Sequence, residues 1–151
     1  MWKASRRSRT RTLGPACVTI GTCTGDRVQV ADTSFLYALF SRSDVFHAKA
    51  RKAAGSTDAI LVPSEIYSET LSLIQYRRGF GPARDACMWL RSQRKIQILG
   101  PSPSLLDQAW GIFRSARGRL SYPDAVVLGW CRERRARPLA FDRMILRRAK
   151  G

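Results

Sequence analysis

Four carboxylates in this chain stand beside apolar runs, at positions where they could either cap a helix or bind a cation. Asp32 follows RVQVA, Asp142 follows RPLAF, and Asp124 stands in LSYPDAVVLGW. Glu69 lies in SEIYSETLSL, where the residues three before and four after it are apolar, so its charge borders an apolar helix face. Because 27 Lys+Arg stand against 11 Asp+Glu, acids that converge rather than pair with arginine favour a hard cation such as Mg²⁺ or Mn²⁺.

Three of these acids also have a purely structural explanation. Ser121 and Asp124 have the spacing of a capping box, in which each side chain bonds the other residue's backbone N–H. Asp32 and Asp142 precede predicted helices, where an N-cap acid stabilises the helix by about 1 kcal/mol. Glu69 lies inside its predicted helix, and a charge next to a core needs a partner. For Asp32, Asp124 and Asp142, helix capping and metal binding both remain possible roles.

The charge of the chain indicates which substrate such a site would meet. A formal net charge of +16 is the sign expected of a partner rich in phosphate, and nucleic acid fits better than an anionic membrane, since no long basic amphipathic helix is present. The sequence has no apolar stretch of 18 residues, so no membrane-spanning helix is predicted. Cations held by carboxylates, next to a basic surface that binds phosphate, are the groups needed to hydrolyse phosphodiester bonds.

The elements that must position these acids alternate between strand and helix. Short β-branched runs are followed by turn residues and then by segments with helical periodicity. The pattern predicts strands over 27–32, 58–64, 95–99 and 137–141, and helices over 32–42, 43–54, 64–78, 81–95, 103–116, 121–136 and 142–150. Strands joined by helices predict an α/β fold, a three-layer α/β/α sandwich with a mostly parallel sheet of four to five strands. Sites in such sheets gather at the carboxyl ends of the strands, where Asp32, Glu69 and Asp142 are expected.

The first 27 residues differ from the rest. They hold six Lys+Arg, one acid and no regular apolar period, which predicts a disordered basic tail over 1–27 and a single folded domain over 28–151. The four cysteines lack zinc-ligand spacing and the chain has one histidine, so a zinc site is not expected. Without a disulfide framework or a convincing signal peptide, the expected compartment is the cytoplasm.

A set of ordered motifs resembles a known family. DTS at 32–34, ET at 69–70, SYPDA at 121–125 and FD at 141–142 are together similar to a PIN-domain ribonuclease, and most similar to the VapC toxins of toxin-antitoxin pairs. The resemblance covers about residues 28–149 and includes DVFHAKA, which matches a frequent D-x-x-H-x-x-A stretch. It departs from the pattern at Pro123, where a small polar residue is commoner, and in the basic tail.

The resemblance implies a role for particular residues. Asp32, Glu69, Asp124 and Asp142 would form the acidic site for Mg²⁺ or Mn²⁺. Ser34 and Ser121 would support that site, and the candidates for contacts with nucleic acid are Arg77, Arg78, Arg119 and Arg143. The expected activity is that of an endoribonuclease acting on RNA, usually a homodimer that is silenced by an antitoxin whose segment enters the acidic groove.

Other interpretations remain beside this one. The chain could be a housekeeping PIN nuclease, or an inactive RNA-binding PIN module whose acids are only helix caps. A phosphoacceptor receiver domain is disfavoured, because it would need adjacent acids after the first strand and a lysine after the last. A single histidine excludes a histidine-pair ribonuclease, and His47 is expected to have a structural role. The tryptophans in helical patterns, Trp89, Trp110 and Trp130, are expected in the core.

Overall fold

A four-stranded parallel sheet lies between two layers of helices. A computed structural model describes residues 28–149. The strands are β1 (Val28–Ala31), β2 (Ala59–Pro63), β3 (Ile96–Leu99) and β4 (Arg137–Leu139). Their order in the sheet is β3-β2-β1-β4, and every pair is parallel. The predicted three-layer fold with a mostly parallel sheet is therefore confirmed.

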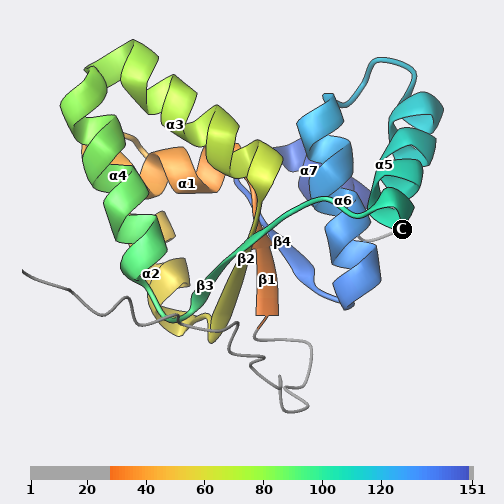
Figure 1. Ribbon diagram of the computed structural model, residues 1–151, viewed down its shortest axis with the longest axis horizontal. Coiled ribbons are helices and arrows are strands. Elements are labelled where there is room, and N and C mark those ends of the chain that lie inside the picture. The colour runs from red at the N-terminus through yellow and green to blue at the C-terminus, as the bar shows by residue number, and fades with distance from the viewer. Residues whose placement is uncertain (1–27, 150–151) are drawn as a thin grey trace, which may run out of the picture.

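Seven helices connect and cover these strands. They are α1 (Thr33–Phe40), α2 (His47–Ser56), α3 (Ser64–Arg78), α4 (Phe80–Ser92), α5 (Pro103–Ala116), α6 (Tyr122–Arg134) and α7 (Arg143–Arg148). Figure 1 shows α1 to α4 on one side of the sheet and α5 to α7 on the other. None of the helices within residues 28–149 is long and apolar enough to cross a membrane. The predicted basic tail, residues 1–27, lies outside the described part of the chain.

Some element boundaries differ from those predicted. The helix expected from residue 43 begins at His47, because the Asp44 carboxylate accepts a hydrogen bond from the Phe46 backbone N–H (2.8 Å) and closes a turn first. The last strand ends at Leu139 rather than at residue 141, so Ala140 and Phe141 belong to the connection that leads to α7. Both differences lie at the carboxyl edge of the sheet and add loop residues there.

Helix α6 is the most deeply buried helix. Seven consecutive residues, Ala125 to Cys131, are buried, so the helix is enclosed on all sides rather than along one stripe. It packs against α5 and against β1, β2 and β4. Gly129 lets α5 approach closely, because a Cβ built there would lie 3.2 Å from the Leu105 side chain. Because α6 is enclosed by its neighbours, its first turn, which carries Asp124, is held at the carboxyl edge of the sheet.

We expect Gly129→Val to destabilise the protein by about 1–3 kcal/mol, because the added carbons overpack the contact between α5 and α6. The matched control is Gly111→Val on the exposed side of α5, where a Cβ would meet nothing within 4 Å. That control should be neutral or slightly stabilising, since valine has the higher helix propensity. Urea unfolding of the two variants measures both effects, and equal stabilities would contradict this account of the packing.

Candidate acidic site

Asp32 is the most buried of the predicted site residues. It follows β1 directly, caps α1 and is 4% exposed. Its Oδ2 accepts hydrogen bonds from the Ser34 backbone N–H (3.0 Å) and from the Ser34 hydroxyl (2.7 Å). Burial raises the pKa of Asp32 above its ordinary value, the bonds from Ser34 and the Thr33 backbone oppose this, and the charge of Asp124 raises the pKa further. The Asp124 charge is the smallest of these influences on the Asp32 carboxyl.

Ser34 joins two distant segments of the chain at this point. Its hydroxyl donates to Asp32 and accepts a hydrogen bond from the Phe141 backbone N–H at 3.0 Å. The Asp32 N–H donates in turn to the Leu139 carbonyl (3.1 Å). The predicted supporting role of Ser34 thus has a structural basis, because its hydroxyl fixes the Asp32 carboxylate relative to the end of β4.

Asp124 forms the capping box that its spacing predicts. The Ser121 hydroxyl accepts from the Asp124 backbone N–H (3.2 Å), and Asp124 Oδ2 accepts from the Ser121 N–H (2.8 Å). The predicted capping box is therefore present. Asp124 caps α6, and its charge also contributes to the raised pKa of Asp32.

Glu69 and Asp142 complete the acidic set from two further elements. Glu69, on α3, is exposed, and its Oε2 accepts a hydrogen bond from the Thr33 hydroxyl (2.7 Å), immediately beside Asp32. Asp142 is also exposed and caps α7, where its Oδ1 accepts from the Met144 N–H (2.6 Å). Sequence reasoning missed Thr33, although its place directly after Asp32 in DTS was the available signal.

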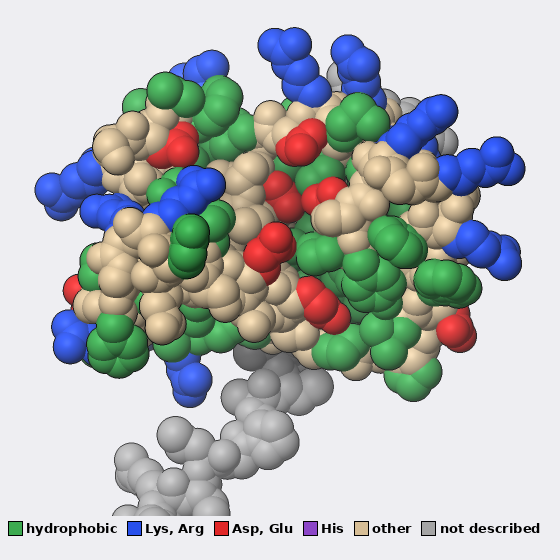
Figure 2. Space-filling model, turned by 90° about the horizontal axis from the view of Figure 1, so that it is seen from above, with side chains coloured by type: hydrophobic (Ala, Val, Ile, Leu, Met, Phe, Trp, Pro, Cys, Tyr) green, Lys and Arg blue, Asp and Glu red, His purple; other side chains and the backbone are tan. Residues whose placement is uncertain are grey.

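The face at the carboxyl ends of the strands is acidic at its centre. Figure 2 looks onto this face and shows Asp and Glu side chains grouped in the middle, with Lys and Arg side chains projecting from the rim. Within residues 28–149, none of Asp32, Glu69, Asp124 and Asp142 forms an ion pair with Lys or Arg; the ion pairs there join Arg84 to Asp85 and Arg134 to Glu133. In a chain with a charge of +16, this leaves the central acids uncompensated.

The chemistry of this donor set fits a hard divalent cation. The candidate ligands are all carboxylate oxygens, and the buried one, Asp32, forms no ion pair with Lys or Arg within residues 28–149. In the side-chain arrangement observed for residues 28–149, no three His, Cys, Asp or Glu side chains are close enough to hold one ion. Coordination by more than two of the acids would therefore require rotation of exposed side chains such as Glu69 and Asp142.

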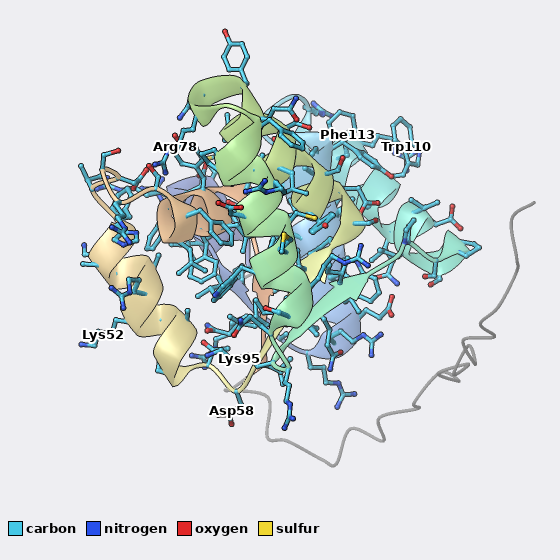
Figure 3. The ribbon with its side chains drawn as sticks, turned by 60° about the vertical axis from the view of Figure 1, so that its left-hand side comes forward. Lys52, Asp58, Arg78, Lys95, Trp110 and Phe113 are labelled. Atoms are coloured by element: carbon cyan, nitrogen blue, oxygen red, sulfur yellow. The ribbon has the colours of Figure 1, made fainter. Side chains whose placement is uncertain are left out.

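Asp58 does not belong to the acidic face. It precedes β2 at the opposite end of the sheet, where Figure 3 shows it near Lys95.

Trp110 and Phe113 also appear in Figure 3, on α5. Trp130 is buried as predicted, but the prediction was wrong for Trp110, which is 54% exposed, and for Trp89, which is 38% exposed. Helical spacing gives the face of a residue without showing whether another element covers that face.

The four predicted basic contacts are exposed, and two of them have defined partners. The Arg77 guanidinium lies over the Tyr37 ring at 5.0 Å, and Arg78 donates to the Phe40 carbonyl (2.8 Å). Arg119 lies in the turn before α6 and Arg143 begins α7, so both are next to elements that carry a central acid. Arg77 lines a pocket together with Ser34 and Asp142, whereas Arg78 lines a different cavity among α1 to α4.

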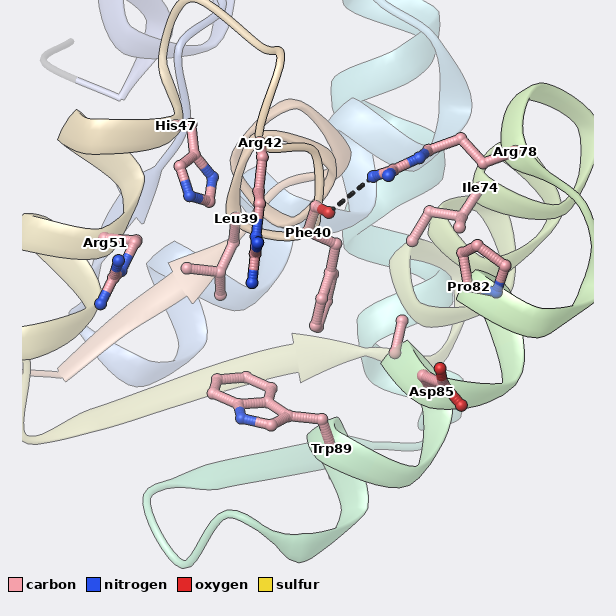
Figure 4. Close-up of a pocket in the computed structure, with 11 residues that line it drawn as sticks. Leu39, Phe40, Arg42, His47, Arg51, Ile74, Arg78, Pro82, Asp85 and Trp89 are labelled. Atoms are coloured by element: carbon pink, nitrogen blue, oxygen red, sulfur yellow. Dashed lines mark hydrogen bonds between the residues drawn. The ribbon is translucent and has the colours of Figure 1, made fainter.

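A cavity of about 650 Å³ lies among helices α1 to α4, apart from the acidic face. It is lined by α1, α2, α3 and α4, and Figure 4 shows Phe40, Trp89 and the Arg78 hydrogen bond within it. None of the four central acids lines this cavity. His47 also borders it, and its Nδ1 lies 2.8 Å from the Ala38 carbonyl, which confirms a structural contact for this residue. The carboxylate that does line the cavity, Asp85, is paired with Arg84 (2.9 Å).

Comparison with known proteins agrees with this architecture. The sequence pattern of the PIN domain matches residues 30–151. The structure of VapC20 from Mycobacterium tuberculosis, a sarcin-ricin loop cleaving toxin, is similar with a TM-score of 0.72 and 25% identity, over 82% of this chain and 95% of that one. No curated protein matches the chain.

Two more distant structures share the fold. A toxin-antitoxin complex from Klebsiella pneumoniae has a TM-score of 0.57 and 17% identity, over 73% of this chain and 82% of that one. VapBC2 from Rickettsia felis, bound to a DNA fragment from its promoter, has a TM-score of 0.61 and 9% identity, over 80% of this chain and 92% of that one. At these identities the likeness concerns the fold alone.

The burial of Asp32 predicts a pH-dependent stability. With metal removed by EDTA, Asp32→Asn should raise the melting temperature at pH 7 by roughly 2–4 °C, the change that about 1 kcal/mol produces in a protein of this size. Asparagine still caps α1 but carries no charge to desolvate. Because the folded pKa of Asp32 is raised above the unfolded value, its penalty is present at neutral pH and is relieved as pH falls through the folded pKa.

Thermal melts between pH 7 and pH 4 would therefore show the wild type and Asp32→Asn converging as the pH falls. Asp107→Asn, on the exposed surface of α5, should track the wild type throughout. An Asp32→Asn protein that melts lower than the wild type at pH 7 would show that the hydrogen bonds to the carboxylate outweigh its desolvation.

Proposed function

Because the chain belongs to the PIN-domain family, we propose that it is a nuclease that hydrolyses RNA phosphodiester bonds with the help of Mg²⁺ or Mn²⁺. The observation that carries this proposal is the buried carboxylate of Asp32, which forms no ion pair with a described residue and whose neighbour Thr33 bonds the Glu69 carboxylate (2.7 Å). Folding does not gain from a buried carboxylate without a basic partner, whereas binding a cation does.

The residues of the site have separable tasks in this proposal. Asp32 and Asp124 would hold the cation, with Glu69 and Asp142 as the further acidic groups at the same edge. Such a cation lowers the pKa of a water molecule and stabilises negative charge on the phosphate. The Ser34 hydroxyl keeps Asp32 oriented, the Thr33 hydroxyl holds Glu69 close by, and the Ser121 N–H anchors Asp124. Arg119 and Arg143 at the rim would bind the phosphates of the RNA.

We further infer a biological setting from the similarity to a VapC toxin. The protein would be the toxin of a toxin-antitoxin pair, acting in the cytoplasm as a homodimer and inhibited by a cognate antitoxin. The apolar side chains that α5 exposes, Leu106 and Trp110, support a contact with another protein chain.

A cleavage assay with purified protein tests the proposed activity. Wild type should cleave RNA in Mn²⁺ or Mg²⁺ and lose this activity in EDTA, whereas Asp124→Asn should reduce cleavage by at least about 100-fold, the size of effect seen when an enzyme loses one electrostatic group at its site. Asparagine can still accept the Ser121 N–H, so loss of the helix cap would not explain the defect.

The matched control is Asp107→Asn, which removes the same charge from the exposed surface of α5 and should retain full activity. Products with a 5′-phosphate are expected from attack by water. Cleavage that continues in EDTA, or an Asp124→Asn protein with wild-type activity, would contradict the proposal and leave Asp124 as a helix cap alone.

A further inference from the structure

A small pocket of about 350 Å³ opens beside the acidic site and contains three aromatic rings. The rings belong to Tyr37 on α1, to Phe46 in the turn before α2, and to Phe141 after β4. Ser34 and Asp142 also line the pocket, so it shares walls with the acidic site. We call it the aromatic pocket.

Two of the rings form a fixed flat wall. Phe46 and Phe141 stack with their centroids 4.6 Å apart and their planes within 9°. Phe141 is half-buried and also contacts the core ring of Phe35 at 6.3 Å, whereas Phe46 remains 37% exposed. The core therefore holds Phe141, and Phe141 in turn orients the partly exposed Phe46 ring, over which the Lys49 ammonium lies 5.7 Å from the centroid.

The polar groups of the pocket supply both hydrogen-bond donors and acceptors. The Arg77 guanidinium lies over the Tyr37 ring, and no acceptor within residues 28–149 receives a hydrogen bond from it. Asp44 lines the opposite part of the pocket and is held by its bond from the Phe46 N–H (2.8 Å). Neither charge forms an ion pair with a described residue. The pocket thus combines apolar rings with a guanidinium donor, Arg77, and two carboxylate acceptors, Asp44 and Asp142.

These features match the chemistry of an unpaired nucleobase. A base has a planar face that stacks on aromatic rings or on arginine, and an edge with both donors and acceptors, and both are accessible only outside a duplex. The larger cavity beside α4 has aromatic and arginine residues too, but it shares no wall with the acids. The aromatic pocket alone of these two is positioned for the nucleotide next to a phosphate at the acidic site.

We propose that the aromatic pocket binds an unpaired base of the RNA, on a nucleotide adjacent to the phosphate that the acidic site would hydrolyse. This inference rests on the proposed function and extends it, because it assigns Tyr37, Phe46, Arg77 and Phe141 to substrate selection. The protein then selects single-stranded or looped RNA through this base rather than through its phosphate contacts, which do not distinguish one sequence from another.

Binding of two RNA probes to the full chain tests the proposal. The probes are a short oligoadenylate and an abasic ribose-phosphate strand of the same length and charge, and both are bound in EDTA so that neither is cleaved. Wild type should bind the oligoadenylate about tenfold more tightly or better, since stacking of one base contributes about 1–3 kcal/mol. Phe46→Ala and Arg77→Gln should each reduce this preference to a few-fold or less.

The control is Arg94→Gln, in the exposed loop before β3 at the opposite end of the sheet, which should leave the preference for the oligoadenylate unchanged. Arg77 is exposed, so Arg77→Gln decides the matter even if Phe46→Ala disturbs folding. Equal binding of the two probes by the wild type, or an unchanged preference in Arg77→Gln, would overturn the proposal. Cleavage is measured separately: base preference without cleavage in Mn²⁺ contradicts the nuclease proposal, and cleavage without base preference contradicts the pocket.

Discussion

The buried carboxylate of Asp32 is the constraint around which the carboxyl edge of the sheet is built. Removing a charge from water is costly, and a second acid nearby increases the cost. The structure offsets part of it with hydrogen bonds from Ser34, which is itself fixed by the Phe141 backbone N–H. No arginine within residues 28–149 forms an ion pair with Asp32, although arginine is abundant. An arrangement of this kind is favourable once a cation is bound, which is why we assign function to this edge.

Capping and cation binding are compatible roles for these acids. Asp32, Asp124 and Asp142 each accept a backbone N–H at the start of a helix, and this contact fixes where the carboxylate stands. Helix starts converge at the carboxyl edge of a parallel sheet, so three caps are brought to one face by the topology itself. A capping residue is thereby held in place for chemistry without any additional element. Only Glu69, inside α3, needs a side-chain partner, and Thr33 provides it.

Much of the fold could be predicted from the sequence, because strand and helix periods are local properties. The four strands, their parallel direction and the positions of Asp32 and Asp142 after β1 and β4 follow from such patterns. Helix coverage could not be predicted, and Trp110 is exposed because no described element packs over the outer side of α5. The aromatic pocket also escaped prediction, since Tyr37 and Phe141 lie about a hundred residues apart and meet only through the pairing of β1 with β4.

The central claim is that the acids at the end of the sheet form a divalent-cation site, and a crystal structure with Mn²⁺ tests it most directly. Anomalous scattering from manganese should place an ion in contact with carboxylate oxygens of Asp32 and Asp124, at the roughly 2.0–2.2 Å typical of such small divalent cations. Glu69 or Asp142 should turn toward the same ion, directly or through water. Crystals grown in Mn²⁺ that show no ion at Asp32, with Asp124 bonded only to Ser121, would contradict the account.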